Sequence, residues 1–130
     1  MSTGDLAEAI RGAASGGIER GDDGIFRQRY VFGPEFPAFV GHFPRQPVLP
    51  AVLQIMAAGL LVEAATGLSL LPIAIERAKF VTPIPPAALV EISCRRSAGP
   101  AGDLWDVRIV ADGQPAASFF LELRAATTGR

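Results

Sequence analysis

A run of twelve residues, 51–62, contains a single polar side chain, that of Gln54. Pro50 precedes the run and Gly67 follows it, and these residue types favour the first turn and the end of a helix. A helix that is apolar on nearly every side must be buried all round. The run falls well short of the about 20 residues that a membrane-spanning helix needs. The sequence therefore predicts a long buried central helix and no membrane insertion.

Alternating apolar and polar side chains predict strands on both sides of this helix. The expected strands cover residues 25–32, 72–82, 88–97, 103–111 and 114–125. Residues 33–50 carry five prolines, which predicts an ordered loop with little regular structure. Short turns between consecutive strands favour an antiparallel meander. The sequence thus predicts an α+β chain with the hotdog fold, an antiparallel sheet of five to six strands wrapped around a long central helix.

The length of 130 residues fits one domain, and 49% hydrophobic residues supply enough apolar surface for a sizeable core. We expect a single hotdog domain over residues 1–130, with its core at about 24–125. Residues 1–23 are expected to form an N-terminal helix and loop, with a short amphipathic helix at residues 4–14. The unpaired edges of such a sheet predict a homodimer or a higher oligomer.

Charge and cysteine content exclude several classes of function. The 12 basic and 13 acidic residues leave no basic surplus, so nucleic-acid binding is not expected. The single cysteine, Cys94, allows no internal disulfide and no Cys/His metal cluster, which fits a reducing compartment. The first residues lack the basic and apolar segments of a secretory signal. We expect a cytoplasmic protein that needs no metal and no cofactor.

Residues 39–53 read FVGHFPRQPVLPAVL. This segment resembles the F-x-G-H-F-P-G-x-P-[VI]-[ML]-P-G-V-L signature of the 3-hydroxyacyl-acyl-carrier-protein dehydratases. Residues 78–86, AKFVTPIPP, are similar to a second block of that family, K-F-x-x-P-V-x-P-G. The resemblance covers roughly residues 24–125.

The resemblance implies removal of water from a 3-hydroxyacyl thioester, carried by acyl carrier protein or coenzyme A, in fatty-acid-type or specialised lipid biosynthesis. His42 aligns with the family's general base, and a neutral imidazole near pH 7 suits that role. Free backbone N–H groups around Ala51 and Val52, at the start of the helix, would stabilise the developing negative charge on the thioester oxygen. The residues implied to contact substrate are Gly41, Phe43, Arg45, Pro50, Ala51, Val52 and Met56.

The chain departs from the family pattern at the position of the acid. The family has a glutamate 14 residues after the histidine, and this chain has Met56 there, which cannot donate a proton. Ala51 stands where the family has a glycine. The glutamine at position 54 is similar to a pattern, P-V-L-P-G-V-x-Q, of a branch of dehydratase-like proteins linked to aryl-polyene and other specialised lipid pathways. Glu35 and Glu76 are other candidate carboxylates, which could reach the pocket from a loop or a partner chain. Glu63 lies about 10 Å further along the helix than Met56 and is expected to be a surface or helix-end residue.

Three functions remain open. The first is a dehydratase-like enzyme with His42 as base and an acid that is missing, relocated or replaced by water. The second is a non-catalytic acyl-thioester-binding subunit paired with an active homologue, which the absent carboxylate at position 56 favours. The third and weakest is a hotdog thioesterase, because the helix carboxylate of such enzymes is absent too.

Overall fold

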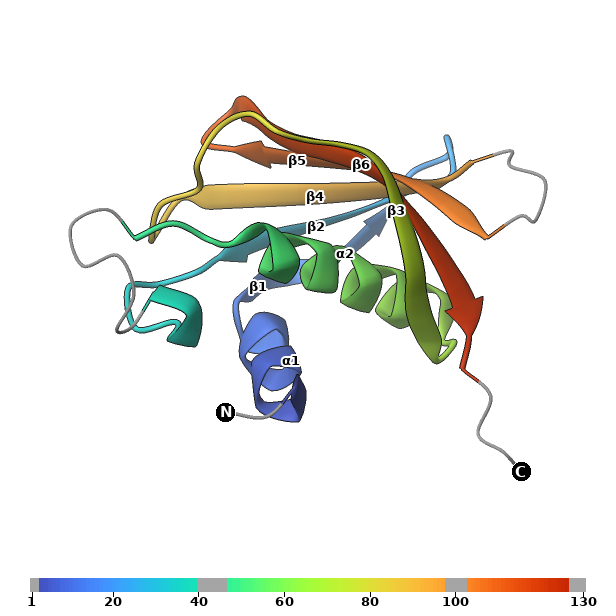
Figure 1. The fold of residues 1–130 in the computed structure, drawn as a ribbon, viewed down its shortest axis with the longest axis horizontal. Coiled ribbons are helices and arrows are strands. Elements are labelled where there is room, and N and C mark those ends of the chain that lie inside the picture. The colour runs from blue at the N-terminus through green and yellow to red at the C-terminus, as the bar shows by residue number, and fades with distance from the viewer. Residues whose placement is uncertain (1–2, 40–46, 98–102, 127–130) are drawn as a thin grey trace.

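The computed structural model describes residues 3–39, 47–97 and 103–126 and shows one long helix packed against one curved sheet (Figure 1). Two helices and a single 3-10 turn are present in these ranges: α1 (Thr3–Gly12), η1 (Pro37–Phe39) and the long α2 (Ala51–Thr66). The strands are β1 (Ala14–Arg20), β2 (Ile25–Val31), β3 (Leu70–Phe80), β4 (Leu89–Arg96), β5 (Leu104–Ala111) and β6 (Gln114–Ala125). This is the hotdog arrangement, so the predicted fold class is confirmed.

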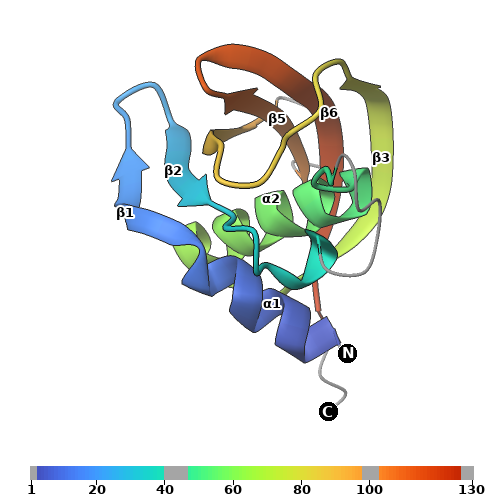
Figure 2. The ribbon, with the colours of Figure 1, turned by 90° about the vertical axis from the view of Figure 1, so that its left-hand side faces the viewer.

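The sheet has the strand order β1-β2-β4-β5-β6-β3, and every neighbouring pair is antiparallel. It curls over α2, and α1 lies on the other side of α2, away from the sheet (Figure 2). The predicted meander holds for β4, β5 and β6. It is wrong for β3, which pairs with β6 and not with β4. Prolines 83, 85 and 86 cannot donate to a strand ladder, so the chain after β3 crosses over before β4 begins.

Helix α2 begins and ends where the sequence predicts. Pro50 is its N-cap residue, in extended conformation, and Gly67 is its C-cap in the left-handed region with φ of 75°. The Gly67 N–H donates to the Glu63 carbonyl oxygen at 2.8 Å. The side of α2 that faces the sheet is buried, at Leu53, Gln54, Ala57, Ala58, Leu61, Val62 and Ala65.

The opposite side of α2 is less covered than the sequence predicts. Val52 is 62% exposed, and Ile55, Met56 and Leu60 are only half-buried. The expectation of a helix buried all round is therefore wrong for the single chain. A sheet covers one side of a helix, and α1 is too short to cover the whole of the other side.

The N-terminal segment holds a strand that was not predicted. Gly12, Gly16 and Gly17 break the helical pattern, which predicts a loop after the first helix, yet residues 14–20 form β1 at the edge of the sheet. Gln28 of β2 explains part of this pairing. Its side-chain Nε2 donates to the carbonyl oxygens of Ser15, at 3.4 Å, and Gly16, at 2.9 Å. These bonds fix the backbone of a strand that has few side chains to pack.

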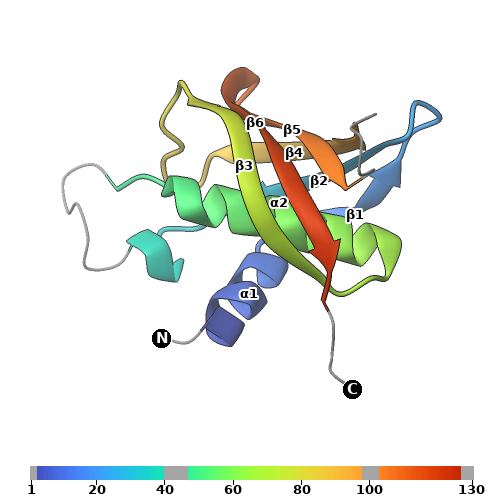
Figure 3. The ribbon, with the colours of Figure 1, turned by 45° about the vertical axis from the view of Figure 1, so that its right-hand side comes forward.

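The other edge of the sheet is the long strand β3 (Figure 3), in which the first six residues are apolar. Its register with β6 shifts twice, between Pro72 and Ala74 and between Glu76 and Lys79. Large apolar side chains remain exposed along it: Leu71 at 52%, Ile73 at 47%, Ile75 at 36% and Phe80 at 42%. Within the described ranges, no helix is both long enough and apolar enough to cross a bilayer.

Candidate functional site

The predicted site residues fall into two groups. Gly41, His42, Phe43 and Arg45 lie outside the described residues, so their predicted roles remain predictions. The other four, Pro50, Ala51, Val52 and Met56, lie on the first two turns of α2 and at its N-cap. The second half of the predicted site thus lies at the start of α2.

Among the described residues, no hydrogen bond uses the first two backbone N–H groups of α2. The carbonyl oxygen of Pro50 accepts hydrogen bonds from the N–H groups of Leu53, at 3.0 Å, and Gln54, at 3.2 Å. Ala51 and Val52 come before these two residues in the chain. Their N–H groups therefore have no carbonyl group of an earlier helical turn to bind. No side chain of the described residues caps this terminus, and both alanine and valine are exposed. The positive end of the helix dipole therefore lies at the position where the family resemblance implies a ligand oxygen.

Met56 lies in an apolar groove of about 230 Å³ between α1, α2 and the sheet edge. The groove is lined by Ala7, Ile55, Met56, Gly59, Leu60, Glu63, Leu70, Pro72 and Leu123. Glu63 is its single ionisable lining residue. At the helix position where the family pattern has its acid, this chain therefore presents a thioether among hydrocarbon groups.

The Glu63 carboxylate accepts a structural hydrogen bond. Its Oε2 accepts from the backbone N–H of Leu70 at 2.7 Å, which joins the last turn of α2 to the first residue of β3. This agrees with its reading as a helix-end residue. It shares the groove with Met56 but lies seven residues along the helix, about 10 Å away by helical rise.

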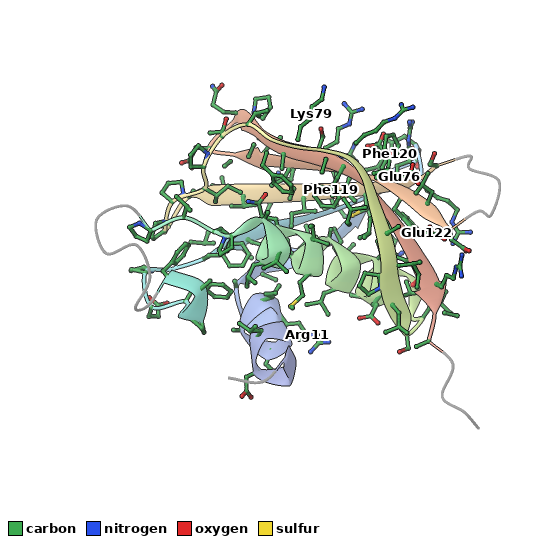
Figure 4. The ribbon with its side chains drawn as sticks, in the orientation of Figure 1. Arg11, Glu76, Lys79, Phe119, Phe120 and Glu122 are labelled. Carbon is green, nitrogen blue, oxygen red and sulfur yellow. The ribbon has the colours of Figure 1, made fainter. Side chains whose placement is uncertain are left out.

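The two other candidate carboxylates lie elsewhere. Glu76 on β3 pairs in register with Phe120, whose neighbour Phe119 is buried on the α2 side of the sheet. Adjacent strand residues face opposite sides. Glu76 therefore lies on the outer face with Lys79, away from α2 (Figure 4). Glu35 is exposed and lines a separate depression beside α1. Neither shares the groove of Met56.

Gln54 is a buried polar residue of α2 that the predicted site residues do not include. It is 5% exposed, and its Nε2 donates to the carbonyl oxygen of Leu49 at 3.0 Å. Leu49 in turn donates its N–H to the carbonyl oxygen of Ile84 at 2.8 Å. The signal that pointed to it was its polarity within an otherwise apolar run.

Two buried groups with ionisable protons lie behind α2. Burial, together with the charge of Asp106, raises the pKa of the Cys94 thiol to about 12. Burial also raises the pKa of Tyr30. The Cys94 Sγ lies 3.9 Å from the carbonyl oxygen of Ala58. A thiol that stays protonated is a poor nucleophile, so Cys94 is a core residue.

Comparisons with known proteins show the family to which this chain is related. A profile of the ApeI-like family, described as ApeI dehydratase, matches residues 19–118. The chain is 40% identical over 108 residues to the 3-hydroxyacyl-[acyl-carrier-protein] dehydratase FabZ of Granulibacter bethesdensis. That alignment covers 75% of this chain but only 62% of the relative, so the chain spans less than two thirds of its length. The resemblance to these dehydratases is confirmed.

Solved structures are similar as well. A chain of the Dehydratase Heterocomplex ApeI:P from Xenorhabdus doucetiae superimposes with a TM-score of 0.70 at 27% identity, covering 82% of this chain and 93% of that one. A hypothetical thioesterase protein with coenzyme A from Streptococcus pneumoniae has a TM-score of 0.64 at 12% identity, covering 96% and 97%. At that identity the likeness concerns the fold alone.

Proposed function

The chain belongs to the ApeI-like dehydratase family, and from this we propose that it dehydrates 3-hydroxyacyl thioesters with His42 as general base. The acyl group is carried by acyl carrier protein or coenzyme A, in a fatty-acid-type or specialised lipid pathway of the cytoplasm. The observation that carries the proposal is the Gly41-His42-Phe43-Pro44 motif placed just ahead of a helix with an uncapped N-terminus.

In this mechanism the His42 imidazole takes the proton from the carbon next to the thioester carbonyl. The electron pair moves toward the carbonyl oxygen, and the N–H groups of Ala51 and Val52 stabilise the negative charge there. The electrons then form the carbon–carbon double bond as the 3-hydroxyl leaves. Because Met56 holds no proton to give, water or the protonated imidazole supplies the proton that makes the leaving group water.

Met56 also supports a second candidate function, a non-catalytic subunit that binds acyl thioesters beside an active homologue. A methionine in an apolar groove retains space for an acyl chain but lacks the acid. The similar structure from Xenorhabdus doucetiae is named a heterocomplex, which is consistent with such pairing.

The dehydratase is proposed to operate as a homodimer. The exposed apolar residues of β3 occupy an unpaired strand edge, a surface that commonly associates with another chain. A second copy joined at this edge would also approach the uncovered side of α2, because β3 borders the groove of Met56 through Leu70 and Pro72.

Hydration of crotonyl-pantetheine or crotonyl-coenzyme A, followed by loss of absorbance of the conjugated thioester, tests the proposal. We expect turnover by the wild-type protein and its loss in His42→Ala, with an unchanged circular dichroism spectrum. His42→Gln, which keeps a polar side chain but no base, serves as the matched control and is expected to be equally inactive. Equal rates in the wild type and both variants would exclude His42 as the base. Thioester binding without turnover in the wild type would support the non-catalytic subunit instead.

A further inference from the structure

The outer face of the sheet, which points away from α2, carries a band of basic and hydroxyl side chains. The band crosses five strands in register, from β2 through β4, β5 and β6 to β3, at Arg27, Ser93, Arg108, Ser118 and Lys79. In β4, β5 and β6 the residues on either side of the band are buried, so its own side chains face outward. Figure 4 shows Lys79, at one end of the band, on this side of the sheet.

The charge of the band differs from that of the whole chain. It holds two arginines and one lysine and no acidic residue, whereas the chain has a net charge of -1. Glu19 of β1 lies opposite Arg27 and marks the end of the band. The positive charge is therefore a local feature of this face, and it favours contact with an acidic surface.

The cations of the band are available to a partner. The Arg108 side chain is 71% exposed, and its Nε lies 3.4 Å from the Asp106 carboxylate. Arg27 pairs with Asp23 at 3.1 Å, also at the surface. Exposed ion pairs contribute only about 0–1 kcal/mol, so a second carboxylate can replace or share them at little cost. Among the described residues, no ion pair involves Lys79.

A depression adjoins the middle of the band. Its volume is about 290 Å³, and Ser93 and Arg108 of the band line it together with Ile25, Arg95 and Asp106. Arg95 lies opposite Asp106 in register, is exposed, and takes part in no ion pair among the described residues. Arginine is enriched in protein interfaces. The depression therefore offers a partner's side chain a recess beside a guanidinium group that no carboxylate neutralises.

The spacing of the three cations indicates the kind of segment that fits them. Arg108 is two strands away from Arg27 and two strands away from Lys79, which corresponds to about 10 Å in each direction. Residues seven apart on an α-helix share one side of it and lie about 10.5 Å apart along its axis. In an extended chain, residues on one side recur at about 6.7 Å and 13 Å. A helix thus matches the spacing, and an extended peptide does not.

We propose that this band docks an acidic α-helix of a partner protein, which lies across the strands and presents carboxylates seven residues apart. The inference goes beyond the proposed function and does not depend on it. The band lies on the face of the sheet opposite to α2, whereas the groove of Met56 lies between α1, α2 and the sheet edge.

Two alanine-rich helical peptides of about 20 residues and identical composition test the inference. One carries three glutamates spaced seven residues apart, and the other carries them five residues apart, which spreads them around the helix. We expect fluorescence anisotropy of the labelled peptides to show about tenfold tighter binding of the first, weakening as salt is added. Equal binding of the two peptides, or binding of neither, overturns the inference.

Variants then assign the preference to the band. Arg108→Glu reverses its central charge and is expected to bind both peptides equally weakly. Arg124→Glu is the matched control, because Arg124 is another exposed arginine that pairs with an acid two residues before it, Glu122, and lies outside the band. It should keep the preference. Equal losses in both variants would show an effect of net charge alone and overturn the inference. If Arg108→Glu does not fold, Lys79→Ala is used in its place, and an unchanged preference in that variant overturns the inference.

Discussion

The carboxylate of Glu63 accepts a 2.7 Å hydrogen bond from the backbone N–H of Leu70, which ties the end of the central helix to the start of the edge strand. Gly67, in left-handed conformation, makes the turn between them. Position 63 therefore serves the geometry of the fold, although its carboxyl group lines the same groove as Met56.

Replacing Glu63 separates this structural role from a catalytic one. We expect Glu63→Ala to lower the free energy of unfolding by about 1–3 kcal/mol, because a hydrogen bond to a charged acceptor is lost. Glu63→Gln keeps an oxygen acceptor and should lose less. Urea denaturation measures both. If Glu63→Gln abolishes hydration activity while remaining folded, the residue is the relocated acid and not a structural one.

Restoring the family's acid is expected to raise activity. In Met56→Glu the apolar groove would raise the pKa of the new carboxyl group, which increases the fraction that can donate a proton near pH 7. General acid assistance contributes about 10²–10⁴-fold to a rate. Met56→Gln, similar in size but without an acidic proton, is the control. The measurement is the steady-state hydration rate of each variant, with folding checked by thermal unfolding. Equal rates in Met56→Glu and Met56→Gln would show that the lost acid is not the sole defect.

The edge strand predicts the state of assembly. Light scattering is expected to give twice the chain mass of 13.7 kDa at micromolar concentration. Ile73→Lys places a charge on the exposed edge and should produce a monomer, since lysine on an edge strand opposes pairing. Leu89→Lys, at a residue 51% exposed at the start of β4, is the control and should leave the dimer intact. If the wild-type protein is a monomer, the model in which two chains join their sheets at β3 is wrong.

Cys94 predicts a loss of stability in alkali. Its thiol has a pKa of about 12 in the folded protein, against an ordinary value of 9.0 that applies when unfolded. Between these values the folded protein retains a proton that the unfolded chain releases, so stability falls as pH rises. The slope from one group is at most about 1.4 kcal/mol per pH unit.

The variant Cys94→Ala should therefore show a flatter decline from pH 8.5 to 10, measured by urea unfolding at each pH. Its overall stability is expected to be lower because a buried side chain is shortened. The two proteins are compared only by the slope of the free energy of unfolding against pH. The pKa of Tyr30 is raised by burial and by the charge of Cys94 from an ordinary value of 10.0, so the two proteins are compared below that pH. Parallel profiles below that pH would show that Cys94 is accessible to solvent in the folded state.

The sequence predicts the central helix well because its signals are local. Pro50 and Gly67 mark its ends, and the apolar run between them has few alternative structures. Strand β1 could not be predicted in this way, because Gly16 and Gly17 carry no pattern and the strand depends on Gln28 of a neighbouring strand. The pairing of β3 with β6 likewise joins segments that are far apart in the sequence, and the alternation of apolar and polar residues does not determine it.

The candidate site also has a part that local sequence signals predict and a part that depends on tertiary contacts. The motif residues predict the helix start as a ligand position, and the alignment with a family pattern identifies Met56 as a departure. The bond from Gln54 to Leu49 could not be predicted, since it joins a helix residue to an irregular segment whose path depends on Ile84. Hydrogen bonds of that kind follow from tertiary packing and not from spacing in the sequence.

The strand order has a consequence for biosynthesis. On the ribosome β3 emerges long before β6, which supplies its hydrogen-bond partners from Ala117 to Ala125. Throughout that interval the nascent chain carries an unpaired strand with exposed leucine, isoleucine and phenylalanine side chains, the kind of segment that promotes aggregation. Pairings between distant segments also slow folding. Rapid expression should therefore favour inclusion bodies, and slower synthesis at low temperature should give a larger fraction of folded protein.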